Sequence, residues 1–309
     1  MQIDKLDTTI SHYASHDDIV KVVEMGNITE LQFMQKRNKH ATIKVLPGME
    51  SYVHLSTGEI KDIKHHDTRA EQKKSLLRTF ANARALINTN VTDVNKVRWI
   101  TLTYSENMTD TKRLYDDFKQ FNMRFQYWCN KQGFGKAEYI VMMEPQERGA
   151  WHAHLLYIWQ DKAPFIPNDK LAEIWRYGFV KVKKLDDVDN VGAYLTAYLG
   201  DMEINEVQNI TDGKLKTVDV LDDNGIKQKK FYIKGARLHL YPKGFKMIRH
   251  SKGIKEPAVT YMTYDKAQKK VLGATKTFES AVKLTDNNGF ENIIAKEYYN
   301  SKRMENQSQ

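Results

Sequence analysis

Hydrophobic and polar residues alternate most regularly in the middle of the chain. The period of two that is typical of β-strands recurs in residues 99–104 (WITLTY), 138–144 (EYIVMME), 151–159 (WHAHLLYIW) and 179–183 (FVKVK). Apolar residues at helical spacing lie between or after these runs, over residues 108–131, 168–175 and 190–199. The pattern predicts the order β-α-β-β-α-β-α, with a hairpin turn over residues 145–150.

This order favours an α+β fold in which helices pack on an antiparallel sheet, because two of its neighbouring strands are joined as a hairpin. It disfavours a doubly wound parallel sheet. Asn168 is the expected N-cap of the second helix, and Asp187 or Asp189 is the expected N-cap of the third.

The flanking segments have weaker patterns. Residues 1–36 are polar and mixed, which suggests a helical or loose leader, and Thr68–Asn88 has helical spacing. Short strands are expected over 41–46, 51–56 and 59–64, hairpins around residues 223–225 and 272–273, and a polar, disordered tail from Asn300. We therefore expect an N-terminal extension (1–96), a catalytic core (97–202) and a C-terminal accessory region (203–309).

Composition places the chain among globular proteins, with 41% hydrophobic and 28% charged residues. The single cysteine, Cys129, excludes an internal disulfide and a cysteine zinc cluster. No run approaches the roughly 20 apolar residues that span a bilayer, and the N-terminus has no signal-peptide core, so we expect a cytoplasmic protein without a membrane partner. The net charge of +9 mildly favours a polyanionic partner, although many soluble proteins are as basic.

His152 and His154 lie two positions apart in a predicted strand, so both imidazoles project from one face, about 6–7 Å apart at the backbone. Such a pair can bind one divalent ion. Glu144 ends the preceding strand and could complete a two-histidine, one-carboxylate set with positions open for water or substrate. Gln146 and Glu147 in the turn compete for this role. The alternative is a pair of partly buried histidines bonded to the backbone, with an exposed carboxylate nearby.

Tyr194 and Tyr198 are four positions apart on a predicted helix, so their side chains share a face. A free tyrosine has a pKa of about 10, and ionising it near pH 7 costs about 4 kcal/mol. A divalent ion beside a phosphoryl group would stabilise the charge that develops while tyrosine attacks phosphorus and forms a phosphotyrosine. The alternative is an amphipathic helix that buries both rings.

The runs WITLTY, MMEPQERGAWHAHLLY and VGAYLTAYLGD, in this order and spacing, resemble the three motifs of the HUH endonucleases. The closest resemblance is to the rolling-circle replication initiator (Rep) proteins of bacterial plasmids and phages. It covers about residues 97–202 and implies a ferredoxin-like or RRM-like sheet. Residues 237–255 (RLHLYPKGFKMIRHSKGIK) are also similar to the region after the catalytic core in phage-type initiators.

The resemblance implies that His152 and His154 bind Mg²⁺ or Mn²⁺, with Glu144 as the third ligand. It implies that Tyr194 or Tyr198 cuts one DNA strand and leaves a 5′-phosphotyrosine and a free 3′-OH. Tyr198 is the favoured nucleophile, because relatives with one tyrosine sometimes carry an acid at the position of Tyr194. Two tyrosines would allow alternating attacks, so that a second transfer closes the displaced circle.

The sequence departs from the Tyr-x-x-Lys pattern of many relatives, since Ala197 and Asp201 stand at the lysine positions. Candidates for the missing positive charge are Lys181, Lys183 and Lys184, whose alternative role is a solvated strand face. Arg148 in the hairpin turn could contact a phosphate, or could serve the turn alone. The basic segment 243–255 is a candidate duplex-binding surface or a solvated face.

These features predict a site-specific, metal-dependent single-strand endonuclease and strand transferase that initiates rolling-circle replication. Its substrate would be origin DNA presented as a single strand or an extruded hairpin. The chain has no GxxxxGK[ST] motif, so a host helicase is an expected partner, together with a polymerase that extends the free 3′-OH. The alternatives are a conjugative relaxase or transposase of the same chemistry, and a non-catalytic DNA-binding regulator in which the histidines and tyrosines merely pack.

Overall fold

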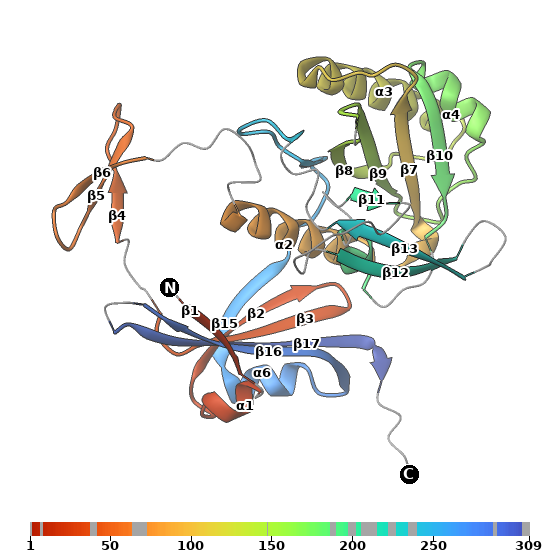
Figure 1. Cartoon of the computed structure of the whole chain (residues 1–309). Helices are drawn as coiled ribbons and strands as arrows, with labels where there is room; N and C mark the ends of the chain where they lie inside the picture. Colours follow the sequence, from red (N-terminus) through yellow and green to blue (C-terminus); the bar gives the residue numbers. More distant parts are fainter. Residues whose placement is uncertain are drawn as a thin grey trace, which may run out of the picture. The chain divides into compact units, whose positions relative to one another are not determined.

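The chain folds into two compact units (Figure 1). In the computed structural model, the described residues are 2–6, 9–37, 42–63, 73–146, 148–185, 190–196, 202–204, 215–221, 227–233, 240–286 and 289–304. Unit 1 comprises residues 1–66 and 257–309, and unit 2 comprises residues 67–256. This division differs from the three expected segments, because strands from both ends of the chain pair in unit 1.

Unit 2 is built on a five-stranded antiparallel sheet with the order β10-β7-β9-β8-β14. Its strands are β7 (Val97–Tyr104), β8 (Glu138–Pro145), β9 (Trp151–Ile158), β10 (Gly178–Lys183) and β14 (Ile248–His250). The first four are joined by α3 (Thr111–Lys131) and α4 (Asn168–Trp175) as β-α-β-β-α-β, the ferredoxin-like arrangement. The α+β prediction is therefore confirmed, and β14 is a fifth strand that the sequence pattern did not predict.

One face of this sheet is covered by α3 and α4. Asp110 begins α3 by accepting hydrogen bonds from the backbone N–H groups of Lys112 and Arg113. Side chains three or four residues apart then form its buried stripe: Leu114, Phe118, Phe121, Phe125 and Cys129. They pack on the even-numbered side chains of β7 and on Val141, Met143, Leu155 and Tyr157 of β8 and β9.

The opposite face carries a smaller apolar cluster against α2 (Lys73–Asn90) and α5 (Val191–Thr196). Leu86 and Ile87 of α2 and Val191 and Leu195 of α5 belong to this cluster. Their partners in the sheet are Val97, Ile140, Met142 and Leu156. The two helices therefore cover one part of this face, toward the start of β7 and the end of β9.

Two further elements belong to unit 2. A short 3-10 helix, η1 (Val94–Lys96), leads into β7. A separate antiparallel sheet has the order β11-β13-β12, from β11 (Met202–Ile204), β12 (Leu215–Leu221) and β13 (Lys227–Ile233). The turn expected around residues 223–225 lies outside the described residues.

Unit 1 has a six-stranded antiparallel sheet with the order β1-β16-β17-β3-β2-β15, in which strands from the two ends of the chain alternate (Figure 1). Its strands are β1 (Gln2–Leu6), β2 (Ile19–Met25), β3 (Ile28–Met34), β15 (Ala258–Thr263), β16 (Ala274–Thr285) and β17 (Glu291–Met304). The helices α1 (Ile10–Tyr13) and α6 (Tyr264–Lys270) pack on it through Ile10, Tyr264 and Ala267. The expected strands of 41–64 form a small sheet of β4 (Ile43–Val45), β5 (Ser51–His54) and β6 (Ile60–Asp62).

Three expectations for unit 1 are wrong. Residues 1–36 are not a leader, because β2 and β3 pair as a hairpin through Gly26, whose φ of 62° suits glycine. Residues 261–278 are not a hairpin, because α6 separates β15 from β16. The tail does not begin at Asn300, which is fully buried within β17, and residues 305–309 lie outside the description.

Two expected helix caps also differ. Pro167 occupies the N-cap position of α4, and Asn168 instead accepts a hydrogen bond from the backbone N–H of Val182 on β10. The side chain of Asn190 caps α5 by accepting from the N–H of Ala193, whereas residues 186–189 are outside the description. Within the described part of the chain, no helix is both long enough and apolar enough to cross a membrane.

Candidate active site

The strand register places the three predicted metal ligands on one face of the unit 2 sheet. His152 pairs with Glu144 on β8 and with Thr103 on β7, and His154 pairs with Met142 and Thr101. Directly paired residues share a face, as do residues two apart along a strand. Glu144, His152 and His154 therefore project together, on the face that carries α2 and α5.

His154 is held by contacts on three sides. Its Nε2 lies 3.3 Å from Oε2 of Glu144, whose side chain is 8% exposed. Its Nδ1 lies 3.2 Å from the hydroxyl oxygen of Thr101. The ring of Trp99 stacks on the imidazole, with centroids 5.5 Å apart and planes inclined by 19°. These contacts fix the ring so that one nitrogen faces the glutamate.

Glu144 is the candidate third ligand that contacts a predicted histidine ligand. Gln146 points into the turn, where its Oε1 accepts a hydrogen bond from Nε of Arg148, and Glu147 lies outside the described residues. The imidazoles of His152 and His154 have centroids 6.1 Å apart, with planes inclined by 67°. Among the described side chains, no group of three or more His, Cys, Asp or Glu is gathered closely enough to hold a metal ion.

Tyr194 belongs to α5, which packs on the same sheet face as the histidines. Leu195 turns inward to contact the cluster formed by Met142 and Leu156, whereas the Tyr194 side chain is 47% exposed. The phenol is therefore accessible to a large substrate. Tyr198 lies outside the described residues, so the expected pair of phenols is placed only for its first member.

The position of α5 is set by close contact with α2. Oδ1 of Asn88 accepts a hydrogen bond from the backbone N–H of Gly192, and Nδ2 of Asn88 donates to Oδ1 of Asn190. A β-carbon at Gly192 would lie 2.5 Å from the carbonyl oxygen of Arg84, so only glycine permits this approach. Arg84 also donates through Nε to the hydroxyl of Thr196.

The tyrosines on the other face of the sheet have a different environment. Burial, and then the carboxylate of Asp117, raise the pKa of Tyr104 far above its ordinary value, and burial does the same for the pKa of Tyr157. Tyr104 donates its hydroxyl hydrogen to Asp117, and Tyr157 donates to Asn122. These phenols are part of the packing and cannot act on a substrate.

The four predicted DNA-binding cations are not all in one place. Lys181 pairs in register with Thr101, and Lys183 pairs with Trp99, so both lie on the face of the histidines. Lys184 lines a cavity against the opposite face. Arg148 is exposed in the β8–β9 turn. Lys181 and Lys183 are therefore the two that share a face with the candidate active site.

Lys246 is a cation near Glu144 that was not singled out from the sequence. The carbonyl of Met247 accepts a hydrogen bond from the N–H of Met143, so the β14–β8 pairing continues toward Glu144 beyond the register pair Ile248 and Met142. Alternation along this extension assigns exposed Lys246 to the histidine face, level with Glu144. The period-two run in KMIRH is the signal that could have revealed this strand.

Comparison with known proteins bears on the same segment. Residues 97–203 match the sequence model of a family described as replication-associated protein, ORF2 type. The match begins at the first residue of β7 and ends within β11, so it includes the candidate ligands and α5. It supports a replication initiator that interacts with DNA. No curated protein and no solved structure matches the chain.

Proposed function

We propose that this chain is a metal-dependent, single-strand DNA endonuclease and strand transferase that initiates rolling-circle replication. The family match over residues 97–203 supports the role in replication. The observation that carries the nuclease chemistry is the contact between His154 and Glu144 on the sheet face that also supports α5. A regulator that only binds DNA would have no need for this pair beside an exposed tyrosine.

The donor set fits Mg²⁺ or Mn²⁺. Two ligands at roughly 2.1 Å from one ion, at right angles, lie about 3.0 Å apart. The 3.3 Å between Nε2 of His154 and Oε2 of Glu144 is close to that value. His152 would join as the third ligand after rotation of its ring. Such an ion would polarise the scissile phosphate and stabilise its developing charge.

The remaining roles belong to side chains of this chain. Thr101 and Trp99 orient His154, as partners of metal-ligating histidines commonly do. Tyr194 or Tyr198 attacks phosphorus through its phenolic oxygen, which forms a phosphotyrosine bond and releases the 3′-oxygen of the preceding nucleotide. Lys181, Lys183 and Arg148 would neutralise neighbouring phosphates. A polymerase could then extend the free 3′-OH while a host helicase separates the strands.

A cleavage assay tests the proposal. Single-stranded and hairpin fragments from the DNA beside the coding region, labelled at the 3′ end, would be incubated with the protein and Mg²⁺ or Mn²⁺. We expect a labelled covalent adduct that migrates with the protein in a denaturing gel. Tyr194→Phe plus Tyr198→Phe should abolish it. An adduct that survives this double change would refute the tyrosine assignment, and binding without cleavage of any fragment would favour a regulator.

The metal site needs its own variant. His154→Ala should reduce adduct formation at least about 100-fold, because loss of a mere partner of a ligand already costs roughly 10–100-fold. It should also weaken Mn²⁺ binding measured by calorimetry. The matched control is His250→Ala, which removes a histidine 3.8 Å from Glu256 elsewhere in unit 2 and should leave both measurements unchanged. Equal Mn²⁺ binding by the two variants would contradict the site.

A further inference from the structure

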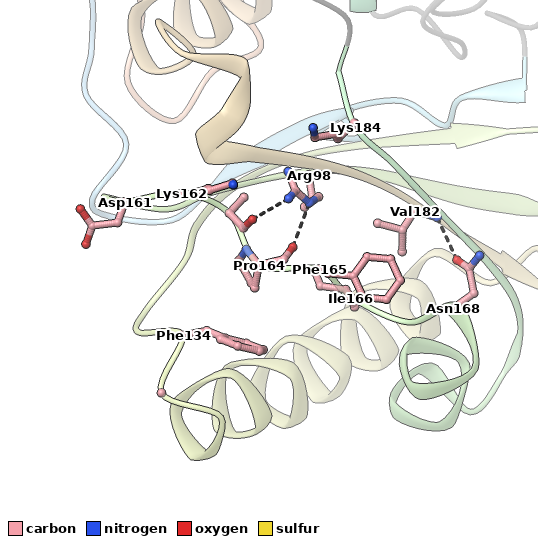
Figure 2. Close-up of a pocket in the computed structure, with 12 residues that line it drawn as sticks. Arg98, Phe134, Asp161, Lys162, Pro164, Phe165, Ile166, Asn168, Val182 and Lys184 are labelled. Atoms are coloured by element: carbon pink, nitrogen blue, oxygen red, sulfur yellow. Dashed lines mark hydrogen bonds between the residues drawn. The ribbon is translucent and has the colours of Figure 1, made fainter.

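A cavity of about 930 Å³ lies beside β10, against the face of the unit 2 sheet that carries α3 and α4 (Figure 2). Val182 of β10 and Phe134, just beyond α3, contribute to its walls, and both pack against the core of that face. Ligand sites commonly have volumes of roughly 300–1,000 Å³. The cavity is therefore large enough for part of a substrate, and it is separated from His152 and His154 by the sheet.

The loop along one side of the cavity is pinned from below by Arg98. This buried guanidinium donates from Nε to the carbonyl of Pro164 and from Nη2 to the carbonyl of Ala163 (Figure 2). The next residue, Phe165, is 81% exposed. An exposed aromatic ring on an anchored backbone is costly to leave in water and is already ordered for a ligand.

The charges around the cavity select the kind of ligand. Lys162 and Lys184 line it, and Asp161 is the acidic residue among its lining side chains. Lys181 and Lys183 lie on the other face of β10, the edge strand of the sheet. A chain of phosphates that leaves the histidine face can therefore follow lysines over this edge to the cavity.

We propose that this cavity binds single-stranded DNA next to the cut, with a base stacked on Phe165 and phosphates held by Lys162 and Lys184. The site rests on and extends the proposed function, because a nickase must hold the strand beyond the scissile phosphate. Base stacking on an aromatic ring tolerates any sequence, so this site contributes affinity instead of origin specificity. The apolar walls from Pro164 and Val182 suit a flat base.

The first test uses Phe165 as a fluorescent reporter. In Phe165→Trp, oligothymidine should quench the added tryptophan emission relative to the same titration of the unchanged protein, in buffer with EDTA. Phe165→Ala should weaken binding of a labelled oligonucleotide about tenfold by anisotropy. The matched control is Tyr127→Ala, since Tyr127 is a 61% exposed aromatic on α3 that does not line the cavity, and its loss should change nothing.

The second test concerns the lysines. For single strands, each neutralised phosphate contributes about 0.7 to the slope of log affinity against log salt concentration. The pair Lys162→Ala plus Lys184→Ala should therefore reduce that slope by about 1.4. The pair Lys112→Ala plus Lys119→Ala, on exposed positions of α3, is the control and should not change it.

The outcomes separate this inference from the proposed function. Absent quenching together with unchanged binding by Phe165→Ala would overturn the inference even if cleavage is robust, and would leave the cavity for another ligand. Quenching and weakened binding would support it even if no fragment is cleaved, since EDTA removes any dependence on the nuclease reaction.

Discussion

The two faces of the unit 2 sheet have opposite character. The face under α3 and α4 is filled by large aromatic side chains, and its polar groups are satisfied internally, as in the bond from Tyr104 to Asp117. The other face has an apolar half under α2 and α5 and a polar half with Glu144, His152 and His154. One face thus provides stability, while the other leaves an end of the sheet for chemistry.

This difference follows from the alternation of strand side chains. On β9, Ala153 and Leu155 point into the aromatic core, and His152 and His154 point the other way. A rigid core directly behind the histidines limits their motion, which a preorganised site requires. Substitutions on one face should therefore alter stability and substitutions on the other should alter activity.

The largest expected effect breaks the core face. Phe125→Ala removes a fully buried ring whose centroid is 4.4 Å from that of Tyr157, and should lower the free energy of unfolding by about 3–5 kcal/mol in urea denaturation. Cleavage per folded molecule should change little. Tyr127→Ala on the same helix is exposed and should cost less than about 0.5 kcal/mol. Equal losses for both would mean that α3 is not anchored by this stripe.

The order of elements in unit 2 was predictable because local patterns there are strong. Asp110 precedes a long amphipathic stretch, and the runs that became β7, β8 and β9 alternate clearly. Unit 1 was not predictable in the same way. Its strand β17 pairs with β3, far away along the chain, and such pairing leaves no local signal. The helix α6 buries only Tyr264 and Ala267, too few positions to reveal a period.

The candidate site shows the same limit. The shared face of His152 and His154 follows from their spacing alone. The neighbours of His154 do not, because Trp99 and Thr101 come from β7 and their contact depends on strand register. Lys246 depends on β14, whose pairing with β8 again joins distant segments. The ligand types were thus predictable, and the residues that orient them were not.

A smaller effect should follow from loosening the helix that carries Tyr194. Asn88→Ala leaves the backbone N–H of Gly192 buried without its acceptor, which should cost roughly 1–3 kcal/mol of stability. Cleavage should also fall, because α5 loses a contact that positions it. Asn90→Ala, which removes bonds to Lys255 instead, should lower stability without reducing cleavage. Comparable loss of cleavage in both variants would show that general destabilisation is the cause.

The smallest effect should come from the hydroxyl of Thr101, which contacts His154 from the neighbouring strand. Thr101→Val keeps the shape and β propensity of the side chain but removes the oxygen 3.2 Å from Nδ1. The imidazole then loses one of its orienting contacts, and cleavage should fall about tenfold, the lower end of the range for such partners. Excess Mn²⁺ should restore much of the rate if the loss is in metal affinity. A Thr103→Val control, placed opposite His152, has no recorded bond to His154 and should respond differently. If neither change alters the metal dependence of cleavage, stacking on Trp99 and contact with Glu144 are enough to hold His154, and the polar half of the face is more rigid than its hydrogen bonds require.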